Sequence, residues 1–551
     1  MDLGAKSYST LVKAVKDGKI EEEYIDRAVA NVLRLKFQMG LFENPYTDEK
    51  RADTILRCPE HLATAEKIAE KSIVLLKNDG LLPIRKDLRS VAVIGPAADT
   101  VSYGDYTETR GRKGGVSVLD GIRAAVSPET EVLYERGCNF LGQALHPFGP
   151  SMLYDENGKA GLTGRYYNGP VPQGEPVQVR TDRTVNFNWI FALPHPALDA
   201  NCFSVVWTGS VVMPRTMDGC IGLSTQDSMR LYVDDKLLID GWGKDKSADQ
   251  ALDFHFEAGR TYKIRIEFVN DRRGARVIFG YSAGRENFPA AVEAARKADV
   301  AILCMGDNEE TSGENFDRTD LNLPGRQLEL VQAVYATGTP VVLVLQSGRP
   351  VTANWENDHL PAILEAWFPG EQGGTAIAKT LFGDAAPGGR LPITFPRSVG
   401  QIPCHYSRRP GGGKRYVEMD WLPLYPFGYG LTYTTFAYRD MALSRSVIDP
   451  QDTVTVSVTV TNTGKYTGDA VPQLYVRDMF SSVVKPERQL AAFRRLTLAP
   501  GESRRVELTV GPKQLRTLGP DYVWRVEPGK FELQLGDNAE NILLRADLTV
   551  E

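Results

Sequence analysis

Val300-Ala-Ile-Leu-Cys-Met-Gly306 is an uninterrupted apolar run that ends in glycine, and it decides the fold. Similar short runs begin at Val91, Val341 and Ala362. Continuous apolar strands of this kind are typical of a mostly parallel sheet that is buried on both faces. Helical patterns over Ala63–Ser72 and Gln327–Tyr335 alternate with them. The sequence therefore predicts an α/β domain.

This α/β pattern is interrupted and then followed by segments of a different texture. Between about 155 and 285, strands such as Tyr262–Phe268 alternate apolar and polar residues, which predicts an all-β insert. The last 115 or so residues return to strict alternation, as in Thr453–Thr461, which predicts a β-sandwich. Near the N-terminus, apolar residues at helical spacing from Ile25 to Phe37, followed by Gly40, predict a capped helix that needs a packing surface.

The composition excludes several classes of partner. The 551 residues include 64 basic and 70 acidic ones, which are interspersed and give a net charge of -6, so no nucleic-acid partner is expected. No run of eighteen apolar residues and no export signal occur, so no membrane partner is predicted and the compartment stays open. The six histidines show no metal spacing, and neither a metal nor a cofactor is predicted. The six cysteines are isolated, and only Cys202 and Cys220 could pair, if oxidised.

Five motifs carry a more specific resemblance. In chain order they are Lys71–Pro83 (KSIVLLKNDGLLP), Ser312–Arg318 with Leu321–Gly325, Trp367–Gly374 (WFPGEQGG), Gly388–Pro392 and Tyr425–Tyr433 (YPFGYGLTY). The chain resembles family 3 glycoside hydrolases of the β-glucosidase or β-xylosidase kind over essentially its whole length. The insert resembles a PA14 module, and the C-terminal sandwich resembles a fibronectin type III-like domain.

The resemblance implies a multidomain α/β plus β protein, in which an α/β sandwich domain is interrupted by a PA14 β-sandwich or barrel and is followed by the fibronectin type III-like sandwich. The expected boundaries are 1–45 for a remnant of the last helices of a (β/α)8 barrel, 46–154 and 286–400 for the two parts of the α/β sandwich domain, 155–285 for the PA14-like domain, 401–435 for a linker loop and 436–551 for the fibronectin type III-like domain.

The same resemblance implies that one catalytic group is missing. Family members carry a (β/α)8 barrel of about 250 residues ahead of these domains, and its Ser-Asp-Trp motif supplies the nucleophilic aspartate. The only Asp-Trp here is Asp420-Trp421, in the loop before the YPFGYG motif, and there is no Lys-His pair. We therefore expect the nucleophile to be absent from this chain.

Glu314 is the expected general acid/base. A retaining glycosidase needs two carboxyl groups about 5 to 5.5 Å apart, and Glu314 matches the family's acid/base position, in a loop after a predicted strand end. Glu309 and Glu310 are fallback candidates in the same loop, whose length varies in the family. A loop glutamate taken alone is usually just solvated.

Ser312 and Trp367 are the candidate substrate-binding residues, although an aromatic residue in a glycine-rich loop more often packs between domains. Asp317 and Arg318 are expected to form an ion pair that anchors the loop.

PA14 modules that bind sugar through calcium have two adjacent aspartates where this chain has Gln226-Asp227, so calcium is not expected. The module is expected to wall the substrate pocket.

The predicted activity is retaining, exo-acting hydrolysis of terminal β-linked sugars, of the β-glucosidase type. The expected partners are a β-linked oligosaccharide or aryl glycoside, with a barrel-supplying chain or a homo-oligomer as further options. A non-catalytic carbohydrate-binding or accessory protein and an inactive truncated fragment are the alternatives.

Overall fold

A computed structural model describes most of the chain. The described residues are 8–107, 114–141, 145–189, 193–225, 227–243, 250–271, 275–283, 288–308, 311–314, 316–411 and 415–551. They form two compact units, Met1–Thr64 and Ala65–Glu551. Within the described ranges, no helix has the length and apolar character that crossing a membrane would require.

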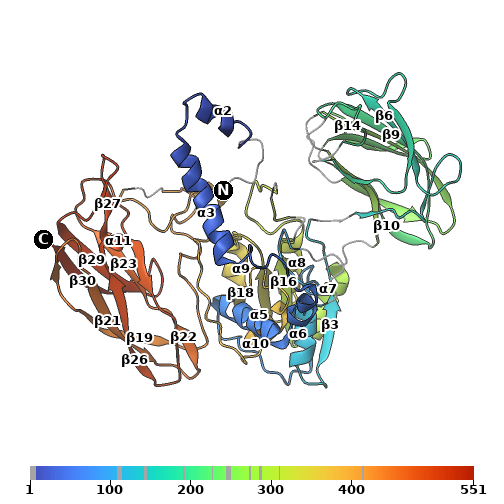
Figure 1. The fold of residues 1–551 in the computed structure, drawn as a ribbon. Coiled ribbons are helices and arrows are strands. Elements are labelled where there is room, and N and C mark those ends of the chain that lie inside the picture. Colours follow the sequence, from blue (N-terminus) through green and yellow to red (C-terminus); the bar gives the residue numbers. More distant parts are fainter. Residues whose placement is uncertain are drawn as a thin grey trace. The chain divides into compact units, whose positions relative to one another are not determined.

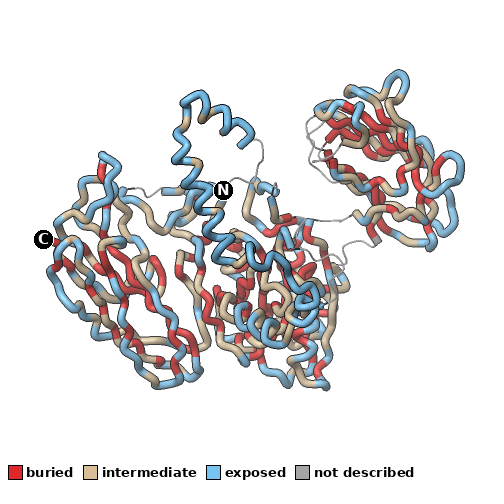
Figure 2. Tube along the Cα trace, viewed as in Figure 1, coloured by how far each residue is buried: buried red, intermediate tan, exposed pale blue. Residues whose placement is uncertain are grey.

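The first unit contains the predicted N-terminal helix. Its helices are α2 (Leu11–Lys16), α3 (Glu22–Gln38) and α4 (Glu49–Ile55). Gly40 follows α3 with φ +67°, and its N–H bonds the carbonyl of Phe37, so the predicted glycine cap is confirmed. No residue of α3 is buried, and Phe37 is 62% exposed; Figure 2 shows the helix almost wholly in the colour of exposed residues.

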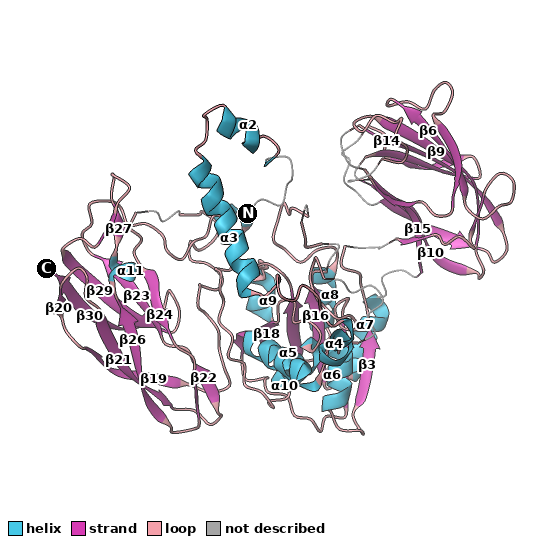
Figure 3. Ribbon diagram, in the orientation of Figure 1, coloured by secondary structure: helices cyan, strands magenta, loops and turns pink. Residues whose placement is uncertain are grey.

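A six-stranded sheet forms the centre of the second unit (Figures 1 and 3). Its strands are β1 (Val74–Asn78), β2 (Ser90–Ile94), β3 (Glu131–Glu135), β16 (Val300–Gly306), β17 (Val341–Gln346) and β18 (Ala362–Glu365). They lie in the order β1-β18-β17-β16-β2-β3, and only the β1–β18 pair is antiparallel. Every residue of β2, β16, β17 and β18 is buried. The predicted mostly parallel, doubly buried sheet is confirmed.

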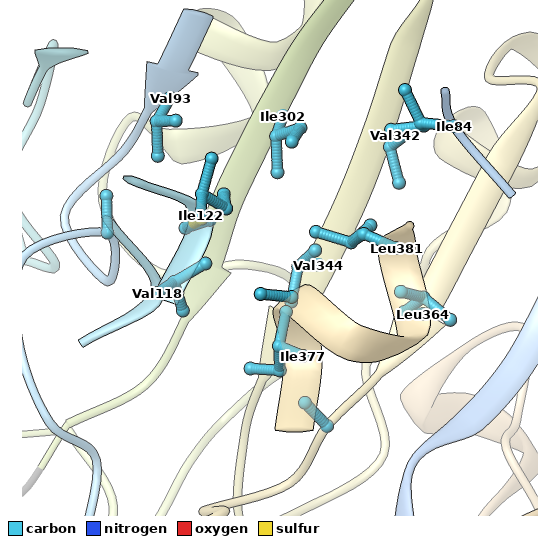
Figure 4. Close-up of a cluster of buried hydrophobic side chains, with 14 of the residues drawn as sticks. Ile84, Val93, Val118, Ile122, Ile302, Val342, Val344, Leu364, Ile377 and Leu381 are labelled. Atoms are coloured by element: carbon cyan, nitrogen blue, oxygen red, sulfur yellow. The ribbon is translucent and has the colours of Figure 1, made fainter. Parts of the chain in front are cut away.

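Helices supply the apolar surface for both faces of this sheet. They are α5 (Pro59–Ser72), α6 (Val118–Ala125), α7 (Phe288–Lys297), α8 (Gln327–Tyr335), α9 (Asn354–His359) and α10 (Gly373–Leu381). Figure 4 shows Ile122 of α6 and Ile377 and Leu381 of α10 beside the sheet residues Ile302 and Val344. Residues of α7 and α8 belong to the core on the other face.

The insert forms two antiparallel sheets. The strands are β4 (His146–Pro147), β5 (Leu153–Tyr154), β6 (Leu162–Asn168), β7 (Gln178–Asp182), β8 (Asn186–Asn188), β9 (Phe203–Val212), β10 (Met217–Thr225), β11 (Ser228–Val233), β12 (Lys236–Asp240), β13 (Gln250–Phe256), β14 (Thr261–Asn270) and β15 (Arg276–Ala283). One sheet has the order β13-β10-β15-β4 and the other β12-β11-β14-β9-β6-β7. β4 pairs with β15, opposing His146 to Tyr281, so the pairing begins ahead of residue 155.

The C-terminal part contains only strands and one short helix. They are β19 (Phe436–Leu443), β20 (Val447–Ile448), β21 (Val454–Asn462), β22 (Gly468–Ala470), β23 (Gln473–Asp478), β24 (Gln489–Phe493), β25 (Leu496–Leu498), β26 (Ser503–Val510), α11 (Pro512–Leu515), β27 (Thr517–Leu518), β28 (Trp524–Arg525), β29 (Gly529–Gly536) and β30 (Ile542–Val550). A 3-10 turn, η1 (Val399–Gln401), lies in the preceding loop. Burial alternates residue by residue along β21, as predicted.

Replacement of Gly374 by alanine should destabilise the α/β domain. A Cβ at this position of α10 would lie 1.9 Å from the carbonyl oxygen of Ser117, which precedes α6. Because backbone cannot yield as a side chain does, we expect a loss of about 1–3 kcal/mol in the free energy of unfolding, measured by chemical denaturation. Gly149→Ala is the control, since a Cβ there meets no atom within 4 Å. Equal stability of the two variants would contradict this close approach.

Candidate active site

The loop that carries Glu314 begins at the end of β16 and leads to α8. Parallel strands end at the same edge of a sheet, and ligand-binding groups of open α/β sheets lie beyond their carboxyl ends. The segments that follow β2, β16, β17 and β18 therefore meet at one edge. The structure confirms that Glu314 lies in a loop beyond a strand end.

A buried ion pair fixes the start of this loop. The Asp307 carboxylate, which is fully buried, accepts a hydrogen bond from Arg349 Nη1 at 2.5 Å and one from Thr311 Oγ1 at 2.9 Å. Thr311 Oγ1 in turn accepts from the backbone N–H of Asn308 at 3.0 Å. Arg349 follows β17, so two neighbouring strand ends are joined. Charge-assisted bonds of this kind are among the strongest hydrogen bonds in proteins.

Glu314 itself is exposed, and its backbone is held from another part of the chain. Its N–H donates to Asp105 Oδ2 at 3.0 Å. Asp105 lies in the segment between β2 and α6, on the other side of the insert in sequence. No ion pair to Glu314 forms within the described part of the chain. Its carboxyl group can therefore reach solvent and a ligand.

The other predicted site residues have different surroundings. Ser312 is half-buried, and its Oγ lies 3.1 Å from the position that a Cβ on Gly348 would take. Trp367 is half-buried against the core, with its ring edge-on to Phe395 at 5.9 Å between centroids. Glu309 and Glu310 lie outside the described residues. The structure thus brings Ser312 close to the end of β17 and packs the Trp367 ring on the interior.

The prediction of an ion pair between Asp317 and Arg318 is wrong. Arg318 Nη2 lies 3.9 Å from Asp320 Oδ1, and Asp317 is exposed. Burial, reinforced by the positive charge of Arg349, lowers the pKa of the Arg318 guanidinium. The partner is therefore two positions further along the chain, where the loop turns toward α8.

Glu365 is a buried carboxyl group that sequence reasoning missed. It is the last residue of β18 and is completely buried, and its Oε1 accepts from the backbone N–H of Trp367 at 2.8 Å. Its Oε2 has no hydrogen-bond partner among the described residues. Burial raises its pKa well above the usual value of 4.5, and the nearby negative charge of Asp307 adds to this. A glutamate inside the apolar run Ala362–Ala366 was the signal in the sequence.

A cavity of about 100 Å³ lies elsewhere, in the loop that precedes the C-terminal sandwich. Its lining includes Tyr406, Arg408, Trp421 and Glu540 but not Glu314. Arg408 covers the ring of Trp421 at 4.5 Å and bonds Glu540 at 2.8 Å. The catalytic expectation rests on the strand-end loop rather than on this cavity. Across the described ranges, no three His, Cys, Asp or Glu side chains come together as metal ligands would.

Replacement of Glu365 by glutamine should flatten the pH dependence of stability. Because the pKa is raised in the folded state, the fold retains a proton that the unfolded chain releases as the pH rises above 4.5. Stability of the wild type therefore falls with rising pH, by about 1.4 kcal/mol per pH unit from this group, until the folded pKa is reached. Glutamine cannot titrate. The free energy of unfolding of Glu365→Gln, measured by denaturation, should therefore rise relative to that of the wild type as the pH rises.

The exposed Glu129, which precedes β3, gives the matched control. Glu129→Gln should keep the pH slope of the wild type. A difference in unfolding free energy between Glu365→Gln and the wild type that stays constant from pH 5 to pH 8 would contradict the raised pKa of Glu365.

Comparison with known proteins identifies the family. The model of the glycosyl hydrolase family 3 C-terminal domain matches residues 73–433, and that of a fibronectin type III-like domain matches residues 470–539. A beta-glucosidase of Rhizobium radiobacter is 34% identical over 98% of this chain and 68% of its own length. A beta-xylosidase of Formosa agariphila is 32% identical over 96% of this chain and 56% of its own length.

Solved structures agree with these matches. A β-glucosidase of Erythrobacter marinus has 30% identity and a TM-score of 0.69 over 99% of this chain and 57% of its own. A β-glucosidase of Kluyveromyces marxianus in complex with glucose has 27% identity and a TM-score of 0.70 over 100% of this chain and 70% of its own. The chain thus spans a little over half to about two thirds of these relatives. It belongs to glycosyl hydrolase family 3.

Proposed function

We propose that this chain supplies the proton-donating part of a retaining, exo-acting hydrolase of the β-glucosidase type, with Glu314 as the general acid/base. The observation that carries the proposal is the exposed Glu314 carboxyl group, free of ion pairs to the described residues, on a loop beyond the end of β16 in a family 3 chain. The buried Asp307–Arg349 pair supports it, because an acid needs a fixed loop to meet a leaving oxygen.

In the proposed reaction, Glu314 gives its proton to the glycosidic oxygen while the bond from that oxygen to the anomeric carbon breaks. A carboxylate nucleophile attacks the same carbon and forms a glycosyl ester. The Glu314 carboxylate then removes a proton from water as the water attacks the anomeric carbon of this ester, and the bond from that carbon to the nucleophile breaks, which releases the sugar and the nucleophile. The configuration at the anomeric carbon is retained because it is inverted twice.

The nucleophile in this proposal belongs to a (β/α)8 barrel outside the 551 residues. Two observations support this assignment. The chain spans 68% and 56% of the lengths of its glucosidase and xylosidase relatives. Its Asp420-Trp421 pair is engaged locally, since Asp420 Oδ1 accepts from the backbone N–H of Leu422 at 3.1 Å. Alone, the chain should be inactive or nearly so.

The insert has the proposed role of a PA14-like wall of the substrate pocket. Hydrogen bonds hold side chains in its interior in place, because the buried Asp182 carboxylate accepts from Trp207 Nε1 at 2.8 Å and from the Tyr166 hydroxyl at 2.5 Å. A rigid module is what a pocket wall requires. The substrates in this proposal are β-linked oligosaccharides or aryl glycosides, with glucose or xylose at the non-reducing end, as the names of the relatives suggest.

Glu314→Ala should abolish acid catalysis when the chain is combined with a family 3 barrel, fused ahead of it or added as a second polypeptide. On cellobiose, whose leaving group needs protonation, kcat/KM should fall by about 10² to 10⁴-fold. On 2,4-dinitrophenyl β-glucoside the loss in glycosyl-enzyme formation should be small. Azide should restore turnover of this aryl glucoside by the Glu314→Ala protein and yield β-glucosyl azide, detected by NMR.

Glu129→Ala is the control, since this exposed glutamate precedes β3 at the opposite edge of the sheet. It should act like the wild type on both substrates. If the Glu314→Ala protein hydrolyses cellobiose as fast as the wild type, Glu314 is not the acid. If the barrel-containing protein binds glucose or cellobiose but does not hydrolyse cellobiose, the non-catalytic alternative replaces the proposal.

A further inference from the structure

Asp105 contacts the loop that carries Glu314, although the two residues are far apart in sequence. Its Oδ2 accepts from the backbone N–H of Glu314 at 3.0 Å, across 209 positions of the chain. The approach is tight, because a Cβ on Gly313 would lie 2.7 Å from the same oxygen and 3.2 Å from Asp105 Cβ. Glycine at 313 therefore gives the carboxylate access to the backbone of the loop.

The turn that presents Asp105 is unusual in its backbone. Gly104 has φ +88°, and Tyr106 has φ +59° although it is not glycine and is 81% exposed. A bulky residue in the left-handed region costs free energy, and such residues cluster at functional sites. Asp105 therefore lies between two residues of positive φ, in a turn that is strained at Tyr106.

Phe368 wedges this turn in place. Its ring lies 3.1 Å from the position that a Cβ on Gly104 would take and 2.9 Å from the corresponding position on Gly348. Phe368 follows β18, and Gly348 follows β17. Segments that follow β17 and β18 thus support the turn that carries Asp105.

We propose that Asp105 is a positioning residue for Glu314. Its carboxylate holds the Glu314 backbone N–H and thereby fixes the direction in which the Glu314 side chain leaves the loop. This inference rests on the proposed function of Glu314 as the acid. Asp105 acts through the backbone of Glu314 and takes no part in proton transfer.

The contact itself can be tested with residues 1–551 alone. Hydrogen exchange at the Glu314 amide, followed by mass spectrometry of peptides over 311–320, should be at least three-fold faster in Asp105→Ala. Asp105→Asn keeps a carbonyl acceptor and should restore the wild-type rate. Asp199→Ala is the control, because this exposed aspartate accepts from the N–H of Asn201 in the insert. Unchanged exchange in Asp105→Ala would overturn the proposal.

Its consequence for catalysis can be tested in the barrel-containing protein. Asp105→Ala should lower kcat on cellobiose by roughly 10- to 100-fold, a part of what a general acid supplies, with little change in KM. On 2,4-dinitrophenyl β-glucoside the loss should stay under about three-fold. Asp105→Asn should recover most of the cellobiose activity. Equal losses on both substrates would mean a structural role and would overturn the inference.

Failure of the proposed function has a different signature. If Glu314→Ala shows no dependence on the leaving group, Glu314 is not the acid, whatever the Asp105 variants do. If Glu314→Ala shows that dependence and Asp105→Ala matches the wild type on cellobiose, the function stands and the positioning role is wrong.

Discussion

Burial of both faces of the central sheet is the constraint on which the rest of the structure depends. Side chains of β2, β16, β17 and β18 are covered above and below, so these strands can hold almost no polar groups along their length. Chemistry has to be placed where the strands end. The loop with Glu314 and the turn with Asp105 both lie at such positions.

Where charge does enter this interior, it is compensated in two ways. Arg349 and Thr311 bond the Asp307 carboxylate directly. Glu365 ends β18, two strands away from β16 in the sheet; it has no such cation among the described residues, and burial raises its pKa. One buried carboxyl group at these strand ends is thus paired with a cation, whereas burial disfavours the charged form of the other.

Much of this arrangement follows from local sequence, because a strand buried on both faces or on one face leaves a pattern within a few residues. The runs at Val91 and Val300 predicted parallel strands, and the alternation over Thr453–Thr461 predicted a sandwich strand. Long-range contacts leave no such pattern. Nothing near Asp105 in the sequence indicates its bond to Glu314, and nothing near Arg318 distinguishes Asp320 from Asp317 as its partner.

The pairing of β4 with β15 brings the two ends of the insert together, with His146 opposite Tyr281. β2 must pair with β16 although about 200 residues separate them, and a ribosome needs roughly 10 to 40 seconds to add that many. An unstructured loop of this size would oppose the pairing through its entropy. The insert has a hydrophobic core of its own, and its two ends lie side by side, which shortens the loop that the pairing of β2 with β16 has to close.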